Sequence, residues 1–160
     1  MKEVTIYTDG SAHGNPGPGG WAARLTTANA KGKTVACDIY GGGGENTTNN
    51  QMELTAAIEG LSALTEPCKV TVVADSLYVV NPFAKNWIED WRRKGWKNSK
   101  KKPVANRELW ERLDALVQTH EVTFEHVDGH AGVYDNEIVD TNANIGADTQ
   151  CEPVKTYTAL

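Results

Sequence analysis

Two glycine-rich breaks constrain most strongly how the first third of this chain can fold. One covers residues 14–20 (GNPGPGG) and the other residues 41–44 (GGGG). They delimit three β-rich segments at residues 3–9, 21–25 and 34–40. Short β-rich segments separated by turn residues are typical of consecutive antiparallel strands. The first 44 residues therefore predict a three-stranded meander.

After the second break the pattern changes to helices that alternate with strands. Thr48 and Gln51 have the spacing of a capping box, which predicts a helix start. The apolar positions of this helix recur at intervals of three and four: Leu54, Ala57, Ile58, Leu61 and Leu64. Further along we expect a buried strand at 69–74, helices at 76–81 (interrupted by Pro82), 83–93 and 106–118, a strand at 122–126 and a last segment from Asn136. This order predicts a mixed α/β domain, one sheet with helices packed on it.

Length and cysteine content narrow the class of protein. A chain of 160 residues fits one domain with a real core. No run approaches the roughly 18 apolar residues of a membrane span, and the first residues lack the apolar stretch of a signal peptide. Cys37, Cys68 and Cys151 lie far apart with no CxxC pair, which disfavours a zinc site or a disulfide framework. We therefore expect a cytoplasmic protein with no membrane partner.

The charge is distributed very unevenly along the chain. The whole chain has a net charge of −5, but residues 85–107 carry nine Lys and Arg against two acidic residues. This segment is therefore +7 and the remainder −12. A charge run is usually only a solvated surface, but this imbalance predicts a cationic arm on an acidic body, suited to a polyanionic partner.

Acidic side chains stand where strands end. Asp9 closes the first strand, Asp75 closes the strand at 69–74, and Glu53 lies in the first turns of the helix between them. Sites in α/β sheets collect at the carboxyl ends of strands, and converging carboxylates repel one another unless a cation lies among them. Such oxygen ligands suit Mg²⁺ or Mn²⁺. The alternative is that each is a turn residue or favours a helix dipole, and spacing alone leaves both interpretations open.

Five sequence blocks, in order from about residue 3 to residue 140, resemble type 1 ribonuclease H in its bacterial form. They are YTDGSAHGNPGPGGWAA, TTNNQMEL, VVADSLYVVN, WRRKGWKNSKKKPVANRELW and VDGHAGVYDNEIVD. The resemblance implies a ribonuclease H-like fold, a five-stranded mixed sheet flanked by helices. It also implies a Mg²⁺-dependent endonuclease that hydrolyses the RNA strand of an RNA–DNA hybrid and leaves 5′-phosphate and 3′-hydroxyl ends. We expect a monomer, with the catalytic domain at residues 1–145 and a disordered tail at 146–160.

The resemblance also implies a set of site residues. The four metal-binding carboxylates of the family fall on Asp9, Glu53, Asp75 and Asp140, and its mobile histidine, which assists proton transfer or product release, falls on His130. Two metal ions roughly 3.5–4 Å apart would activate the attacking water and stabilise the leaving oxygen, and we expect Mn²⁺ to substitute for Mg²⁺. The other histidines have no counterpart and are interpreted as ordinary surface or strand residues.

The resemblance further implies substrate contacts. Asn15, Asn49 and Asn50 fall at positions that contact the hybrid across the minor groove, and the resemblance also implies that Thr48 and Asn15 lie near a DNA phosphate. The alternative for Thr48, Asn49 and Asn50 is helix capping, and Thr48 is interpreted as serving both purposes. Trp87 is expected to touch DNA, whereas Trp91, Trp96 and Trp110 are expected to anchor the arm by packing. The basic arm would bind phosphates without reading sequence through Arg92, Arg93, Lys94, Lys97, Lys100, Lys101 and Lys102.

Three departures from the family pattern affect these expectations. Gln51 stands where arginine is common, and Asp128 where a basic residue is frequent. After Asp140 the chain reads TNANIGADTQ instead of a leucine- and alanine-rich helix, and its Thr and Asn are poor helix formers. We therefore expect the helix that carries Asp140 to hold this residue less rigidly than is usual in the family. Two alternatives remain, a hybrid-binding domain without turnover and a transposase or resolvase core, although the latter would lack the TTNN block and the basic arm.

Overall fold

A six-stranded mixed sheet forms the centre of the computed structural model, which describes residues 1–129 and 132–160. The strands are β1 (Lys2–Ala12), β2 (Gly17–Ala28), β3 (Thr34–Thr47), β4 (Cys68–Ala74), β5 (Glu121–His126) and β6 (Val154–Ala159), in the order β5-β4-β1-β2-β3-β6. β1, β2 and β3 form the predicted antiparallel meander, and β4 and β5 run parallel to β1. The predicted mixed sheet is confirmed, although it has six strands and not five.

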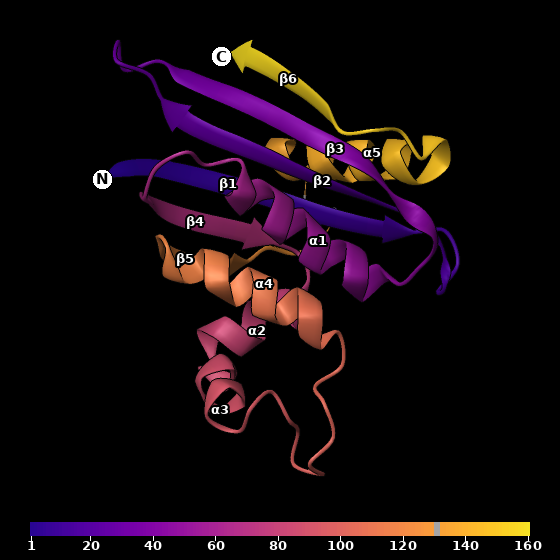
Figure 1. Cartoon of the computed structure of the whole chain (residues 1–160). Helices are drawn as coiled ribbons and strands as arrows, with labels where there is room; N and C mark the ends of the chain where they lie inside the picture. The colour runs from indigo at the N-terminus through magenta and orange to yellow at the C-terminus, as the bar shows by residue number, and fades with distance from the viewer. Residues whose placement is uncertain (130–131) are drawn as a thin grey trace.

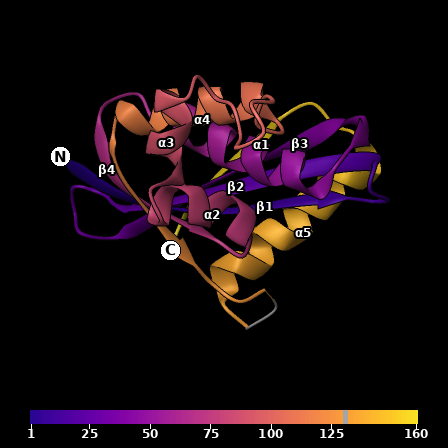
Figure 2. The ribbon, with the colours of Figure 1, turned by 90° about the horizontal axis from the view of Figure 1, so that it is seen from below.

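Five helices lie around this sheet in the described part of the chain (Figures 1 and 2). They are α1 (Asn49–Ser62), α2 (Leu77–Ala84), α3 (Trp87–Arg93), α4 (Arg107–Gln118) and α5 (Tyr134–Thr149). α1 and α4 lie on one face and α5 on the other, as Figure 2 shows. The loop from α3 to α4 extends away from the body at the bottom of Figure 1. The predicted basic arm is therefore a protrusion beside the sheet.

The two faces of the sheet are packed very differently. Between the sheet and α1 and α4 lies a large core in which Ile6, Leu54 and Trp110 are fully buried. On the α5 face, the buried apolar cluster among the described residues consists of Ala22, Val139 and Ala143, with two tyrosines packed against it. Apolar burial, which stabilises roughly in proportion to area, therefore fixes α1 far more strongly than α5.

Three expectations about element boundaries are wrong. β3 continues through the glycines at 41–44, because their backbone keeps pairing with β2 as far as Thr47. α2 continues through Pro82 to Ala84; the ring removes one backbone donor, and the helix ends two residues later. The predicted tail at 146–160 is ordered: α5 continues to Thr149, and β6 pairs with β3 in an antiparallel register. No helix among the described residues is long and apolar enough to cross a bilayer.

Candidate active site

Two predicted carboxylates lie at one edge of the sheet because their strands are parallel neighbours. β1 and β4 pair from Lys2 with Cys68 to Thr8 with Ala74. Asp9 follows the last pair on β1, and Asp75 follows it on β4. The carboxyl ends of parallel strands meet at one edge, and this is where α/β folds place their sites. The register of two apolar strands thus brings Asp9 and Asp75 together.

Gly10 allows the third carboxylate to reach the same place. A Cβ atom at residue 10 would lie 2.3 Å from the backbone nitrogen of Glu53, far inside van der Waals contact. Only glycine therefore lets the start of α1 approach β1 this closely. The capping box predicted for α1 is confirmed, since Thr48 Oγ1 accepts from Gln51 N at 3.2 Å and Gln51 Oε1 accepts from Thr48 N at 3.0 Å. The cap and the glycine together fix where Glu53 lies.

The side chains of Asp9, Glu53 and Asp75 converge. Each offers a carboxylate oxygen, and these oxygens lie within 4.8 Å of one another. Asp9 is 7% exposed and Glu53 8% exposed. Burial, followed by the charge of Asp75, raises the pKa of Asp9 to about 8. Burial, followed by the charge of Asp9, also raises the pKa of the Glu53 carboxyl well above its ordinary value.

This donor set fits a hard divalent cation. Without one, buried carboxylates so close together repel one another, which contributes to their raised pKa values. Glu53 Oε2 is buried and has no hydrogen-bond partner among the described residues. An unpaired buried oxygen costs free energy unless a ligand or ion satisfies it. Among the described residues the cluster consists of three carboxylates, and oxygen ligands favour Mg²⁺ or Mn²⁺ over zinc.

α5 brings the fourth predicted carboxylate to the same site. Asp140 lines a pocket together with Asp9 and Asp75, and its carboxyl raises the pKa of Asp9 through a hydrogen bond and through its charge. The ligand oxygens within 4.8 Å of one another do not include those of Asp140, so it lies at the margin of the cluster. Despite its low helix propensity, the segment after Asp140 is helical up to Thr149.

A buried ion pair holds the first turn of α5 on the sheet. Arg24 of β2 is 2% exposed; its Nε donates to Asp135 Oδ1 at 2.9 Å and its Nη1 to Asp38 Oδ2 at 2.7 Å. Its guanidinium carbon also lies 5.7 Å from the centre of the Tyr134 ring. Removing one partner of a buried pair is costly because the other charge is left unpaired. Nothing in the sequence indicates this attachment, since its residues lie on three separate elements.

Further residues line the same pocket. Thr8 and Asn136 contribute buried oxygens, Thr8 Oγ1 and Asn136 Oδ1, that have no hydrogen-bond partner among the described residues. Both residues belong to the five sequence blocks, but neither is among those predicted to lie in the site. Membership of a block is the available signal, since alternation along a strand does not show which side chains face a pocket. The predicted His130 lies outside the described residues.

The predicted minor-groove residues lie together beside the site. Asn15 Oδ1 accepts from Asn49 N at 3.0 Å, and Asn49 Oδ1 accepts from Ala12 N at 2.9 Å. These bonds tie the β1–β2 turn to the start of α1. Asn50 is exposed on the first turn of the same helix. The structure thus brings Asn15, Asn49 and Asn50 together, next to Thr48.

The basic arm is anchored by aromatic packing, as predicted. Trp91 lies 5.3 Å from Trp110 and 6.3 Å from Trp96, measured between ring centres, and Trp110 is fully buried. Trp87 differs, because it is 44% exposed and Lys85 Nζ lies 5.7 Å from its ring. The expectation that three tryptophans serve packing is therefore confirmed, while Trp87 is available to a partner.

The cations of the arm divide into two kinds. Arg92 donates two hydrogen bonds to Asp114 of α4, at 2.8 and 2.7 Å, and thus joins α3 to α4. Arg93 pairs with Asp90 one turn earlier on the same helix. The lysines on the loop are exposed: Lys94, Lys97, Lys100, Lys101 and Lys102. The lysines are therefore accessible to an anion, whereas Arg92 also has a structural role that the sequence does not reveal.

Comparison with known proteins identifies the family. The family model for RNase H matches residues 1–148. The chain is 51% identical over 143 residues to a ribonuclease H of Oleidesulfovibrio alaskensis, covering 89% of each. It is 48% identical over 151 residues to a ribonuclease H of Thermus thermophilus, covering 94% of this chain and 87% of the relative.

Solved structures agree with this. LC9-RNase H1, a type 1 RNase H with the type 2 active-site motif, superposes with a TM-score of 0.85 at 29% identity, over 98% of this chain and 78% of the other. LC11-RNase H1, solved in complex with an RNA/DNA hybrid, has a TM-score of 0.64 at 24% identity, over 91% and 97% of the two chains, and shares the fold. A family model matched over nearly the whole chain, relatives about half identical to it and a carboxylate cluster at the strand ends lead to one conclusion: this chain belongs to the RNase H family.

Proposed function

We propose that this protein is a metal-dependent endonuclease that hydrolyses the RNA strand of RNA–DNA hybrids, largely independently of sequence, leaving 5′-phosphate and 3′-hydroxyl ends. The observation that carries the proposal is the cluster of Asp9, Glu53 and Asp75, whose oxygens lie within 4.8 Å of one another at an edge of the sheet. Membership of the RNase H family and the hybrid bound to LC11-RNase H1 support the choice of substrate.

The carboxylates would hold two Mg²⁺ ions, with Mn²⁺ as a substitute. Bound there, the ions would supply an activated water for in-line attack and positive charge at the leaving 3′ oxygen. Asp9 and Glu53 are buried and fixed by a strand and a capped helix, so they give the site a rigid base. Asp140 comes from a different helix and closes the site from the other face of the sheet. For His130 we propose the role implied by the resemblance, proton transfer or product release.

The remaining residues would bind and orient the hybrid. The amides of Asn15, Asn49 and Asn50 lie close enough to follow one strand across the wide minor groove, where the 2′-hydroxyl distinguishes RNA from DNA. The exposed lysines of the arm and Trp87 would contact the phosphate backbone and the DNA strand. We also propose a monomer in the cytoplasm, a location that the three free cysteines support.

A substrate comparison tests the proposal. Labelled RNA–DNA hybrid, double-stranded DNA and double-stranded RNA of one sequence are incubated with Mg²⁺, and the ends of the products are analysed. We expect cleavage of the hybrid alone, in its RNA strand, and none by Asp75→Asn at any Mg²⁺ concentration. Binding of the hybrid without cleavage would identify a binding domain, and cleavage of double-stranded DNA would refute the proposal. Turnover of Asp75→Asn within about tenfold of the parent, a barrier change of only ~1.4 kcal/mol, would refute the ligand assignment.

A further inference from the structure

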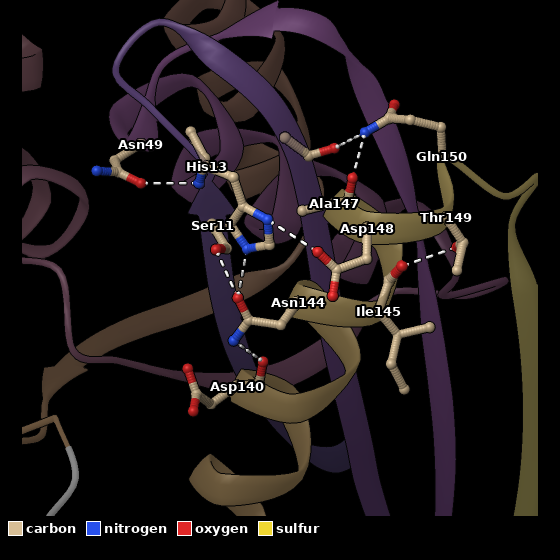
Figure 3. A network of polar contacts seen from close by, with 12 residues as sticks. Ser11, His13, Asn49, Asp140, Asn144, Ile145, Ala147, Asp148, Thr149 and Gln150 are labelled. Atoms are coloured by element: carbon tan, nitrogen blue, oxygen red, sulfur yellow. Dashed lines mark hydrogen bonds and ion pairs between the residues drawn. The ribbon is translucent and has the colours of Figure 1, made fainter.

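A polar cluster joins the end of β1 to α5, close to the site but outside the predicted residues (Figure 3). Ser11 Oγ and His13 Nε2 each lie 2.9 Å from Asn144 Oδ1. His13 Nδ1 lies 2.9 Å from Asp148 Oδ1, one turn further along α5. We name these four residues, Ser11, His13, Asn144 and Asp148, the β1–α5 cluster. His13 is exposed, in agreement with its interpretation as a surface residue, but its ring also bridges two positions of α5.

The contacts define how the Asn144 amide is oriented. Its Nδ2 donates to the backbone oxygen of Asp140 at 2.9 Å, which directs Oδ1 toward β1. An amide nitrogen can only donate and an amide oxygen can only accept. Ser11 has a hydroxyl to donate, and His13 donates to Oδ1 in the form that carries a proton on Nε2, so this orientation suits all three contacts. Asn144 therefore links the turn of α5 that carries Asp140 to the strand that carries Asp9.

This link matters because α5 carries Asp140 and is joined to the sheet by small residues and polar contacts, with few large apolar side chains. Its buried apolar contacts with the sheet, among the described residues, are the small cluster of Ala22, Val139 and Ala143. Polar attachments flank Asp140 on both sides: the Arg24–Asp135 ion pair precedes it by five residues, and Asn144 follows it by four. Polar contacts are directional, so they help to fix the rotation and the translation of the helix, in addition to the close backbone packing at Gly20 and Gly146.

We propose that Asn144 is a positioning residue for the metal site, held by Ser11 and His13, and that it sets where the Asp140 carboxylate lies relative to Asp9. The inference rests on the proposed function, since it assigns Asn144 a part in the same site. Residues that orient metal ligands typically affect metal affinity or activity by about 10–100-fold when they are replaced. The poor helix former at position 144 is then explained by a contact that leucine or alanine cannot make.

Asn144→Ala and Thr149→Ala make a matched pair for the test. Thr149 is on the same helix, and its Oγ1 also donates to the carbonyl four residues earlier, that of Ile145 at 2.7 Å. The two variants lose the same kind of local bond, but only Asn144 also reaches β1. Binding of Mg²⁺ and Mn²⁺ to the full chain, first treated with EDTA and dialysed, is measured by titration calorimetry. The fold is followed by circular dichroism, and kcat and KM on hybrid are measured separately.

The expected result is a metal affinity about tenfold weaker for Asn144→Ala, with kcat lower at limiting Mg²⁺, KM for hybrid within about twofold of the parent, and Thr149→Ala equal to the parent. His13→Ala, at a site where the side chain is 40% exposed and folding is not at risk, should lower metal affinity by a smaller factor. Metal affinity of Asn144→Ala equal to that of the parent, or an equal reduction in Thr149→Ala, would overturn the proposal.

A double-mutant cycle on metal affinity tests whether Ser11 acts through Asn144 or independently of it. If Ser11 acts through Asn144, then Ser11→Ala should weaken metal binding no further once Asn144 is alanine, because the hydrogen bond between them is already absent. Additive reductions in metal affinity would overturn that link. A parent that binds no divalent metal and cleaves no hybrid would instead refute the proposed function, so the two failures are distinguishable.

Discussion

The mutual repulsion of the site carboxylates predicts that removing one of them stabilises the metal-free protein. The pKa of Asp9 rises from an ordinary value of 3.8 to about 8 in the fold, first because of burial and then because of Asp75. Between these pH values the folded state binds more protons than the unfolded state. The free energy of unfolding contributed by Asp9 is therefore fully present below about pH 4 and is lost as the pH rises toward 8. Asp9→Asn removes this loss, because the amide does not titrate.

The magnitude follows from proton linkage. Each proton that the folded state binds in excess changes the free energy of unfolding by up to about 1.4 kcal/mol per pH unit. The difference in free energy of unfolding between Asp9→Asn and the parent is called the gap below. Between pH 5 and pH 8 this gap should therefore widen by at most about 4 kcal/mol. Glu53, whose pKa is also raised by burial and then by its neighbour Asp9, shares the titration, so we expect a widening of roughly 1–3 kcal/mol.

Urea unfolding in EDTA at several pH values between 5 and 8 measures this gap. Addition of Mg²⁺ should reverse it at pH 8, because a ligand at a hundred times its dissociation constant stabilises by about 2.7 kcal/mol and the variant lacks one of the metal ligands. The matched control is Glu45→Gln, which removes an exposed carboxylate from β3 and should leave the pH dependence unchanged. A gap for Asp9→Asn that is constant within about 0.5 kcal/mol over this pH range, less than the effect of a typical point mutation, would refute the reasoning.

Three further predictions concern the arm and α5. Alanine at residues 100–102 should weaken hybrid binding and lower the slope of log affinity against log salt by roughly 0.7–0.9 for each phosphate that the arm no longer neutralises; an unchanged slope would mean that these lysines are only a solvated surface. Arg92→Ala, which removes two charge-assisted bonds to Asp114, should lower the free energy of unfolding by about 1.5–3 kcal/mol, and Arg93→Ala by less than about 1 kcal/mol; equal effects in urea titrations would contradict this. Gly146→Ala should destabilise by about 1–3 kcal/mol in the same assay, since its Cβ would lie 2.2 Å from a β3 carbonyl oxygen, and a neutral effect would show that α5 shifts freely.

Local patterns in the sequence predict those parts of the fold that local physics determines. The meander, the capped α1 and the strand before Asp75 all follow from turn residues, capping spacing and apolar periodicity. The parallel pairing of β1 with β4 then brings Asp9 and Asp75 to one edge. The resemblance supplies what spacing leaves open, above all that Glu53 and Asp140 belong to the same site.

The errors arise where distant segments meet. β6 is almost entirely exposed and has no apolar periodicity, so only its backbone pairing with β3, far away in the sequence, makes it a strand. β3 continues through four glycines because β2 pairs with them. Arg92 has the sequence context of a nucleic-acid contact, yet its partner Asp114 lies on α4. No local pattern contains these partners, so the sequence alone could not indicate them.

The segment after Asp140 illustrates the limit of helix propensity as evidence. Its Thr and Asn residues predict a less rigid helix, yet Asn144 bonds to β1, and Gly146, which also disfavours an isolated helix, lies against the backbone of β3. A side chain at residue 146 would push the helix away, as would one at Gly20, whose Cβ would lie 2.1 Å from the Ala143 oxygen. Differences in propensity amount to about 1 kcal/mol per residue, and tertiary contacts routinely exceed them. The residues that make α5 weak as an isolated helix are therefore those that bring Asp140 close to the carboxylates of the sheet.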